Sequence, residues 1–368
     1  MSAVDVPGSV RREDHFDEGA LADFLRGAFP GDSGAAGGGA SPFLSVSQFG
    51  AGHSNLTYLV TFGGREMVLR RAPHGAAVKS AHDMRREFDV LSALAPFYSK
   101  APKALAFCDD PSVIGAPFFL MERVRGVILR VSQPPPGVDL PPPRMRALSE
   151  AFVDSLAELH ALDVSSGPLA SLGKPEGYAA RQVAGWTERW IRAKTEDVPA
   201  LDAAAAWLAG RLPAASRPAL VHNDFKYDNL VLDAGNPTRI VAVLDWEMAT
   251  LGDPLLDLGT TLGYWIDPDD APEVRALPFG ATLTPGNFSR SEVAALWIAR
   301  TGRSEADLLF AYVFGLFKIA VIAQQIYRRS AEGHTTDPRF AALIHGVRIL
   351  GRQSGRALEG GRIARLNS

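Results

Sequence analysis

One loop gathers residue types that could carry out a reaction. Asp224 follows an apolar segment, Asn229 comes five residues later, and Asp245 ends the next apolar segment. A carboxylate can accept the proton of an attacking hydroxyl, while a carboxamide and a second carboxylate can hold Mg²⁺ on nucleotide phosphates. We therefore predict phosphoryl transfer from ATP, with Asp224 as the base and with Asn229 and Asp245 as ligands of Mg²⁺.

Short strands are the elements that must position this loop. Apolar runs at Ala219–Val221 and Leu230–Leu232 flank it, and a third run, Ile240–Leu244, ends just before the second carboxylate. The spacing from Asp224 to Asn229 equals the Asp-to-Asn spacing of the H-R-D-L-x-x-x-N loop of protein kinases. The order of strand, loop and strand therefore favours a catalytic loop over a chance arrangement of polar residues.

Other polar residues near the loop are expected to support the reaction or the loop itself. Lys226, two residues after Asp224, suits neutralisation of the transferring phosphoryl group, and a solvated loop lysine is the alternative. His222 is expected to brace the loop by hydrogen bonding, because Asp224 already supplies the base. Asp257, in a helix-like segment, is expected to hold N–H groups of the loop.

The stretch from Val243 to Leu258, taken with the loop, resembles the catalytic core of the aminoglycoside phosphotransferase family, a branch of the protein-kinase-like fold. It is similar to a subgroup that occurs alone in bacteria and fused to acyl-CoA dehydrogenases in animals. The likeness extends from about Gln48 to Tyr327. It implies a bilobal α+β fold, with a small antiparallel-sheet N-lobe that carries one main helix and a larger, mainly helical C-lobe.

The hydrophobic patterning agrees with that fold class. Before position 124 it predicts a helix over 81–94 and strands at 43–49, 56–62, 66–71, 104–108 and 118–123. Later it predicts helices over 144–162, 177–194, 201–212, 254–264, 291–300, 305–329 and 339–353. We divide the chain into a flexible N-terminal segment with a short helix (1–40), a nucleotide-binding N-lobe (41–124) and a catalytic, acceptor-binding C-lobe (125–368).

A glycine-containing segment occupies the place of a nucleotide-binding loop. Gly50 and Gly52 would let the backbone approach phosphate oxygens, and the loop N–H groups could cradle them. The third glycine of the protein-kinase pattern is absent, with Asn55 in its place. Ser54 and Asn55 could offer side-chain donors instead.

An arginine stands where protein kinases have a lysine that binds the nucleotide phosphates and a helix glutamate. Arg70 ends the predicted third strand, and its planar fork can grip phosphate, although a solvated strand-end arginine is the alternative. Glu87 shares a helix face with Val90 and Leu91, where an unpaired carboxylate would be costly to bury. We therefore predict an Arg70–Glu87 pair.

In the segment that resembles the connection between lobes, backbone groups of Glu122 and Val124 are predicted to bind adenine.

Composition excludes several classes of protein. Of 368 residues, 46% are apolar and 21% charged, and the net charge of −3 gives no reason to expect a nucleic-acid or anionic-membrane partner. Cys108 is the single cysteine, which excludes an internal disulfide and a multi-cysteine zinc site. The polar start is no secretory signal, and Lys318 interrupts the apolar run 308–323, so we expect a buried core helix and a cytoplasmic protein.

The acceptor site is expected in the helical lobe. The residues of interest there are aromatic and basic and share one helix: Trp186, Arg189, Trp190 and Arg192. A polycationic aminoglycoside would need an acidic wall, and the loop containing Asp267, Asp269 and Asp270 is the candidate for it. The resemblance instead implies hydroxylated acids or their CoA thioesters, and Arg189 or Arg192 would suit an anionic acceptor.

We therefore expect a kinase that uses ATP and Mg²⁺ on a hydroxyl of a small acceptor, a hydroxy acid or a hydroxyacyl-CoA. The alternatives are an aminoglycoside or choline-like amino-alcohol kinase, a protein kinase and a nucleotide-binding module without turnover. The absence of an Ala-Pro-Glu segment disfavours a protein kinase. The catalytic triplet of two aspartates and one asparagine disfavours the binding module, while Arg70 in place of lysine keeps it open.

Overall fold

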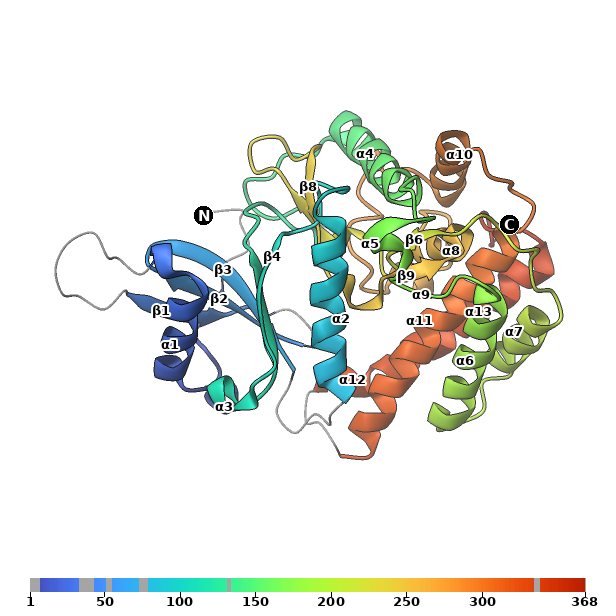
Figure 1. Ribbon diagram of the computed structural model, residues 1–368. Coiled ribbons are helices and arrows are strands. Elements are labelled where there is room, and N and C mark those ends of the chain that lie inside the picture. The colour runs from blue at the N-terminus through green and yellow to red at the C-terminus, as the bar shows by residue number, and fades with distance from the viewer. Residues whose placement is uncertain are drawn as a thin grey trace. The chain divides into compact units, whose positions relative to one another are not determined.

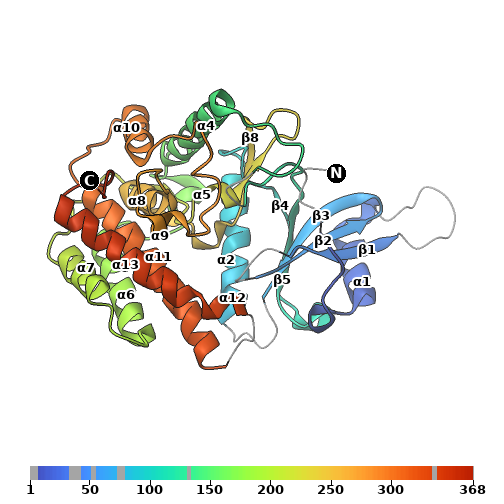
Figure 2. The same ribbon diagram turned by 180° about the vertical axis from the view of Figure 1, so that it is seen from behind.

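The computed structural model describes residues 7–32, 43–50, 55–72, 79–130, 134–333 and 338–367 (Figures 1 and 2). The chain divides into two compact units. One, the sheet unit, comprises Ala3–Val127 together with Val241–Glu247, and the other, the helical unit, comprises Ile128–Ile240 together with Met248–Ser368. The mixture of an antiparallel sheet and many helices confirms the predicted protein-kinase-like α+β fold.

The sheet unit is built on five antiparallel strands in the order β1-β2-β3-β5-β4. The strands are β1 (Leu44–Gln48), β2 (Leu56–Phe62), β3 (Arg65–Arg71), β4 (Ala104–Cys108) and β5 (Phe118–Glu122). Gly63 and Gly64, which join β2 to β3, both have positive φ (58° and 87°), as a tight hairpin turn requires. The register places Arg70 opposite Thr57 on β2 and Phe119 on β5.

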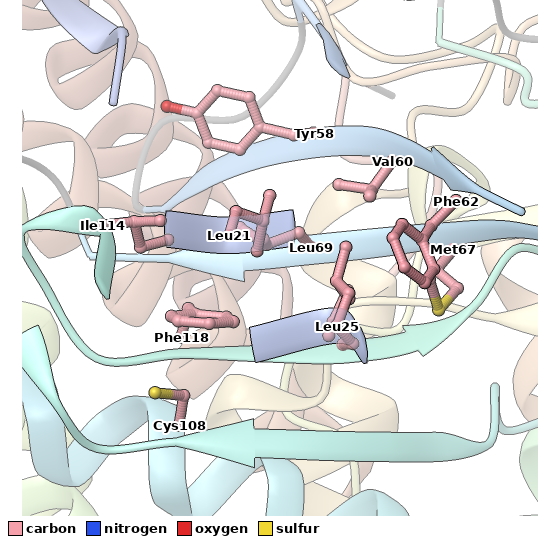
Figure 3. Packing of buried hydrophobic residues seen from close by; sticks show 11 residues of the cluster. Leu21, Leu25, Tyr58, Val60, Phe62, Met67, Leu69, Cys108, Ile114 and Phe118 are labelled. Atoms are coloured by element: carbon pink, nitrogen blue, oxygen red, sulfur yellow. The ribbon is translucent and has the colours of Figure 1, made fainter. Parts of the chain in front are cut away.

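A helix near the N-terminus covers one face of this sheet (Figure 3). Asp17 accepts a hydrogen bond from the Ala20 N–H and begins α1 (Glu18–Ala28). Leu21 and Leu25 of α1 are fully buried among Tyr58 and other alternate residues of the strands. The short helix predicted in this segment is therefore confirmed, and its leucines complete the core of the sheet unit.

A longer helix, α2 (Lys79–Leu94), packs against β4 and β5. Its Phe88 ring lies 5.5 Å from the Phe107 ring and 6.2 Å from the Phe119 ring, measured between centroids. The unit also contains α3 (Pro111–Ile114) and the 3₁₀ turns η1 (Arg12–Asp14) and η2 (Pro30–Asp32). This packing positions α2 on the sheet whose strand β3 carries Arg70.

A segment distant in sequence, Val241–Glu247, is anchored in the sheet unit. The Val243 N–H donates to the Lys100 carbonyl at 2.7 Å, and the Trp246 ring lies edge-on to Tyr98 at 5.9 Å. The Trp246 indole N–H also donates to the Val243 carbonyl, 2.8 Å away. These contacts fix the backbone on both sides of Asp245.

The helical unit contains most of the helices of the described chain. They are α4 (Pro142–His160), α5 (Gly167–Ala170), α6 (Tyr178–Ala193), α7 (Pro199–Ala209), α8 (Pro254–Tyr264), α9 (Pro272–Arg275), α10 (Arg290–Thr301), α11 (Leu308–Ala331), α12 (Pro338–Ala341) and α13 (Leu343–Gly360). The short elements between them are β6 (Ala219–Val221), η3 (Tyr227–Asn229), β7 (Leu230–Leu232), β8 (Ile240–Val243), η4 (Trp246–Met248) and β9 (Thr250–Gly252). The chain passes from one unit to the other within β8 and again within η4.

Helix α11 is the central element of this unit and packs against α6, α7, α8 and α13 (Figures 1 and 2). By length and composition α11 could cross a membrane, but 72% of its most apolar window is buried inside the protein, which confirms the predicted core helix. Gly259 of α8 and Gly315 of α11 face each other at the crossing. A Cβ at Gly259 would lie 2.1 Å from the Ala311 carbonyl oxygen, so the two backbones meet only because side chains are absent.

Several elements differ from the sequence prediction, and among them the short helices α3, α5 and α9 were not predicted. The three-residue strand β9 was not predicted, and it pairs antiparallel with β6, placing Val221 opposite Thr250. The predicted helix 339–353 is divided near Ala342 into α12 and α13, and α13 continues until Gly361, whose φ of 60° ends it. So short a strand gives no periodicity of its own, and pairing with β6 alone defines it.

Candidate active site

A buried carboxylate anchors the loop between β6 and η3. Asp257, in the first turn of α8, accepts hydrogen bonds from the backbone N–H groups of His222 and Asn223, both at 2.7 Å. His160 Nε2 lies 3.0 Å from the same carboxylate, and the Trp297 indole N–H donates to His160 Nδ1, so Nε2 is the protonated nitrogen. Burial opposes ionisation of Asp257, but the hydrogen bonds from His160 and His222 hold its pKa below the usual value. These contacts match the role expected for Asp257.

The backbone of the loop is unusual at Asn223, which has a φ of 67°. A non-glycine residue adopts this left-handed conformation only where its surroundings stabilise it. The Asp257 carboxylate provides that restraint from one side, and His222 Nδ1 accepts the Asp224 N–H at 3.2 Å. His222 therefore braces the loop, as predicted from its position.

Asp224, Lys226 and Asn229 converge at the end of this loop. The Lys226 ammonium lies 3.0 Å from Asp224 Oδ2, and the Asn229 side-chain N–H₂ donates to both the carbonyl and the carboxylate of Asp224 at 2.8 Å. Burial disfavours the charge on Lys226, yet Tyr264 and Asp224 together raise the pKa of its ammonium. The sequence spacing therefore produces one polar cluster with the base, a cation and a carboxamide in contact.

The orientation of Asn229 is suited to metal binding. Because its nitrogen faces Asp224, its carboxamide oxygen points to the opposite side of the group. Amide and carboxylate oxygens are the ligands that Mg²⁺ prefers. Among the residues that the structure describes, no group of three or more His, Cys, Asp or Glu could form a metal site. A metal ion at Asn229 would therefore need oxygen ligands from the nucleotide and water as well.

A second polar cluster lies inside the sheet unit around Arg70, which is 7% exposed. Arg70 forms a buried ion pair with Glu87, and each of its terminal nitrogens lies 3.1 Å from Asp245 Oδ1. Glu247 Oε2 lies 3.5 Å from the same guanidinium and accepts a 2.9 Å hydrogen bond from Asn55. The structure thus brings together four residues that are far apart in sequence, and Arg70 is not a solvated strand-end residue.

Charge is unbalanced in this cluster, because one guanidinium faces three carboxylates. Burial, with further contributions from Asp245 and Glu247, raises the pKa of Glu87 to about 8 despite the neighbouring Arg70. Arg70 Nε and Glu87 Oε2 are buried and have no hydrogen-bond partner among the residues that the structure describes. A divalent cation at Asp245 and a phosphate at Arg70 would offset the excess charge and use the free donor. The residues present therefore fit a metal-bound nucleotide.

Not every predicted nucleotide contact has a structural counterpart. Gly50 is exposed and a Cβ there would meet nothing within 4 Å, while Gly52 and Ser54 lie outside the described residues. Glu122 is exposed at the end of β5, and its N–H already donates to the Lys103 carbonyl at 2.8 Å. An adenine contact by Glu122 would therefore have to use its carbonyl group. Val124 is half-buried just beyond the strand.

Three residues near the catalytic loop were not singled out from the sequence. Tyr264 ends α8 with its ring 4.6 Å from the Lys226 ammonium, and burial together with Asp224 raises the pKa of its hydroxyl. Tyr178 and Lys318 both contact Asn223. The available signal for Lys318 was a charged residue within an apolar helix, which must find a polar partner.

The helix proposed to carry the acceptor site has a mixed role. Trp186 and Trp190 are buried, and the Trp190 indole N–H donates to Asp202 of α7, so Trp190 joins two helices. Arg192 is on the surface and pairs with Glu188. Arg189 differs, because its guanidinium stacks on the Trp186 ring at 4.6 Å and its charge acts on Lys318 beneath the catalytic loop.

The loop that contains Asp267, Asp269 and Asp270 does not form the acidic wall that a polycation would need. Arg290, which is 1% exposed, donates to both oxygens of Asp270 at 2.6 and 2.7 Å, and its backbone N–H donates to Asp267. Burial raises the pKa of Asp267 to about 6. Two of the three carboxylates are therefore internal supports of the helical unit, and only Asp269 is exposed.

Comparisons with known proteins identify the family of the chain. Residues 45–295 match the phosphotransferase enzyme family, which covers more than half of the chain. The chain is 35% identical over 338 residues to acyl-CoA dehydrogenase family member 11 of Gallus gallus, covering 90% of this chain and 42% of that protein. It is also 35% identical over 295 residues to family member 10 of Mus musculus, covering 80% of this chain and 27% of that one. The chain thus spans less than half the length of these relatives.

Solved structures show the same architecture. A protein of Ralstonia eutropha with a provisional aminoglycoside phosphotransferase designation has a TM-score of 0.75 and 30% identity, over 94% of this chain and 99% of that one. The aminoglycoside phosphotransferase APH(4)-Ia, in complex with AMP-PNP and hygromycin B, has a TM-score of 0.57 and 20% identity, over 91% of this chain and 98% of that one, and therefore supports the fold alone. With its kinase-like fold and the match over residues 45–295, the chain belongs to the phosphotransferase enzyme family.

Proposed function

We propose that this phosphotransferase is a small-molecule kinase that transfers the γ-phosphoryl group of ATP to a hydroxyl group, with Asp224 as the base. The observation that carries the proposal is the contact of Asp224 with Lys226 and Asn229 in a loop that buried Asp257 anchors. An acceptor hydroxyl would lose its proton to the Asp224 carboxylate while its oxygen bonds to the γ-phosphorus. The bond from that phosphorus to the β–γ bridging oxygen breaks, and ADP leaves.

The remaining residues of the two clusters bind and orient the nucleotide in this proposal. Asn229 and Asp245 would hold Mg²⁺, which when bound neutralises charge on the phosphates. Arg70, fixed by Glu87, would bind phosphate oxygens through its planar fork. The complex of a related fold with AMP-PNP supports the use of a nucleotide of this kind.

The proposed acceptor is an anion, namely a hydroxy acid or a hydroxyacyl-CoA. Arg189 and Lys226 supply positive charge close to the catalytic loop, as their effect on Lys318 indicates. Asp267 and Asp270, the carboxylates that could have attracted a polycation, are occupied by Arg290. The high identity to proteins named acyl-CoA dehydrogenase family members also favours an acyl-CoA substrate.

An aminoglycoside or amino-alcohol kinase is the second candidate. The structural likeness to APH(4)-Ia with bound hygromycin B favours it. A cationic acceptor would, however, need carboxylates near Asp224, and Asp228 is the one adjacent in sequence. Burial raises the pKa of Asp228 to about 6, which leaves it mostly ionised at neutral pH, but the neighbouring Lys226 and Arg130 offset its charge. We therefore favour the anionic acceptor.

A nucleotide-consumption screen tests the proposal directly. Purified protein would receive ATP or GTP with Mg²⁺ and, in separate wells, hydroxy acids, hydroxyacyl-CoAs, choline-like alcohols and aminoglycosides. We expect acceptor-dependent ADP formation with ATP in the first two classes. ADP formation with aminoglycosides alone would identify the second candidate. Nucleotide binding without turnover across all classes would contradict the kinase proposal and favour a binding module.

The metal assignment has a separate test. ATP with Mg²⁺ should raise the melting temperature of the wild-type chain, and Asp245→Asn should remove the part of that shift that depends on Mg²⁺. A surface variant such as Asp269→Asn is the control and should keep the full shift. An undiminished Mg²⁺-dependent shift in Asp245→Asn would contradict the ligand role.

A further inference from the structure

Lys318 is a buried cation in the middle of α11 that the proposed reaction does not require. Its side chain is 1% exposed. The ammonium donates to the Asn223 carbonyl at 2.7 Å and lies 3.3 Å from Asn223 Oδ1. It also lies 5.8 Å from the centre of the Trp186 ring. Both hydrogen bonds therefore go to a single residue, the one that precedes Asp224.

Asn223 is restrained at every polar atom. Its N–H donates to Asp257, its side-chain N–H₂ donates to the Met248 carbonyl at 3.1 Å, and its Oδ1 accepts from the Tyr178 hydroxyl at 3.1 Å. Its own carbonyl is the acceptor used by Lys318. Residues from four separate segments thus converge on one left-handed residue of the catalytic loop.

The peptide group between Asn223 and Asp224 is held at both ends. Lys318 holds its carbonyl oxygen, and His222 Nδ1 accepts its N–H at 3.2 Å. The orientation of this peptide plane sets the ψ angle of Asn223 and the φ angle of Asp224. It therefore sets the direction in which the Asp224 side chain leaves the backbone.

Holding a carbonyl with a buried ammonium carries a large desolvation cost. Desolvation lowers the pKa of Lys318 to about 8, against the attraction of Asp257 and Asp224 and with the repulsion of Lys226 and Arg189. These opposing influences offset one another, and among the described residues no carboxylate forms an ion pair with the ammonium. An apolar side chain of similar length would avoid this cost but would lose both hydrogen bonds to Asn223.

We propose that Lys318 is a positioning residue that fixes the Asn223–Asp224 peptide and thereby aims the Asp224 carboxylate, at the expense of stability. This inference rests on the proposed role of Asp224 as the base. A displacement of about 1 Å in a catalytic group can lower a rate by about 100-fold, which is sufficient reason to retain a residue that does not stabilise the fold.

Replacement by methionine separates positioning from stability. Lys318→Met should lower kcat by about 100-fold, while the KM for ATP changes by less than about threefold. Its melting temperature should stay within about 3 °C of the wild type, because the hydrogen bond lost and the desolvation cost removed oppose each other. Lys318→Gln, which keeps a neutral donor, should lose about tenfold in kcat.

Gln324→Met on the same helix is the matched control. Gln324 is fully buried, and its side chain donates to the Ala193 carbonyl and to Thr195 rather than to the catalytic loop. It should lower the melting temperature without changing kcat. All kcat values would be measured on folded protein, checked by circular dichroism.

The outcomes distinguish this inference from the proposed function. Absence of turnover in the wild-type chain would count against the proposed function. Wild-type turnover with an unchanged kcat in Lys318→Met or Lys318→Gln would overturn the positioning role. A fall in kcat that only parallels lost melting temperature, as a purely structural residue would show, would overturn it as well. If Lys318→Met does not fold, the same comparison is decided with Lys318→Gln.

Discussion

Arg70 in the sheet unit and Lys318 in the helical unit are both buried cations, but their surroundings are opposite. Arg70 faces Glu87, Asp245 and Glu247, whereas the hydrogen bonds of Lys318 within the described part of the chain go to two oxygens of Asn223. The pKa of Arg70 is raised by its carboxylates against the effect of burial, and that of Lys318 is lowered by burial. We therefore propose phosphate binding for the guanidinium of Arg70 and restraint of the catalytic loop for the ammonium of Lys318.

The largest expected effect is on the chemical step in the helical unit. Asp224→Asn keeps the shape of the residue but removes the base, so kcat should fall by about 1,000-fold. Binding of ATP with Mg²⁺, measured by calorimetry, should change by less than about threefold, because Arg70 and Asp245 remain. Loss of binding together with turnover would contradict the division of labour between the two clusters.

The next prediction compares the stability that is lost when each of the two cations is replaced. Arg70→Met leaves three carboxylates without their shared partner, and we expect it to destabilise the protein by about 3–5 kcal/mol in denaturant unfolding. Lys318→Met should be nearly neutral in the same measurement, as argued above. Similar losses in both variants would show that the two sites are accommodated in the same way.

The two sites should also differ in how their contribution to stability depends on pH. The pKa of Glu87 is raised from its usual 4.5 to about 8 in the folded chain, so its stabilising contribution is lost as pH rises from 4.5 through 8. Lys318 has a pKa of about 8 against 10.5, so its contribution is present above pH 10.5 and is lost as pH falls through 8. In plots of melting temperature against pH, Glu87→Gln should reduce the loss of stability between pH 4.5 and 8. Lys318→Met should reduce the loss of stability as pH falls from 10.5 through 8. If a variant leaves its part of the curve unchanged, that part of the pH dependence belongs to another group.

The smallest effect concerns two arginines of α6. Arg189→Ala should raise the KM for an anionic acceptor about tenfold, since a charge-assisted contact contributes about 1.5–3 kcal/mol. Arg192→Ala should change that KM by less than about twofold, because an exposed pair with Glu188 contributes little. Equal effects from steady-state kinetics would move the acceptor away from Trp186.

The parts of the site that the sequence predicted are those that local spacing determines. Asp224 and Asn229 are five residues apart on one loop, and Glu87 stood on an apolar helix face that required a cation. Lys318, Tyr264 and Tyr178 could not be assigned in this way. Each lies on a helix that is distant in sequence from the loop, and a helical pattern can show that such a side chain is buried without showing which distant loop it meets.

One interpretation failed for a related reason. Asp267 and Asp270 were considered as part of an acidic wall for a polycationic acceptor, because their partner, Arg290, lies on a different helix. Charge density in sequence does not distinguish an exposed acidic surface from an internal support. The long helices were predictable from the period of their apolar residues, whereas strand β9 is defined by its pairing with β6.

The glycine crossing of α8 and α11 has a consequence for distant mutations. Asp257 lies just before Gly259, and Lys318 lies just after Gly315, so the two restraints on Asn223 come from either side of one backbone contact. A methyl group at Gly315 would sit 2.0 Å from the Gly259 carbonyl oxygen and force the helices apart. A screen for inactive but soluble variants should therefore recover alanine at both glycines, at positions that no substrate touches.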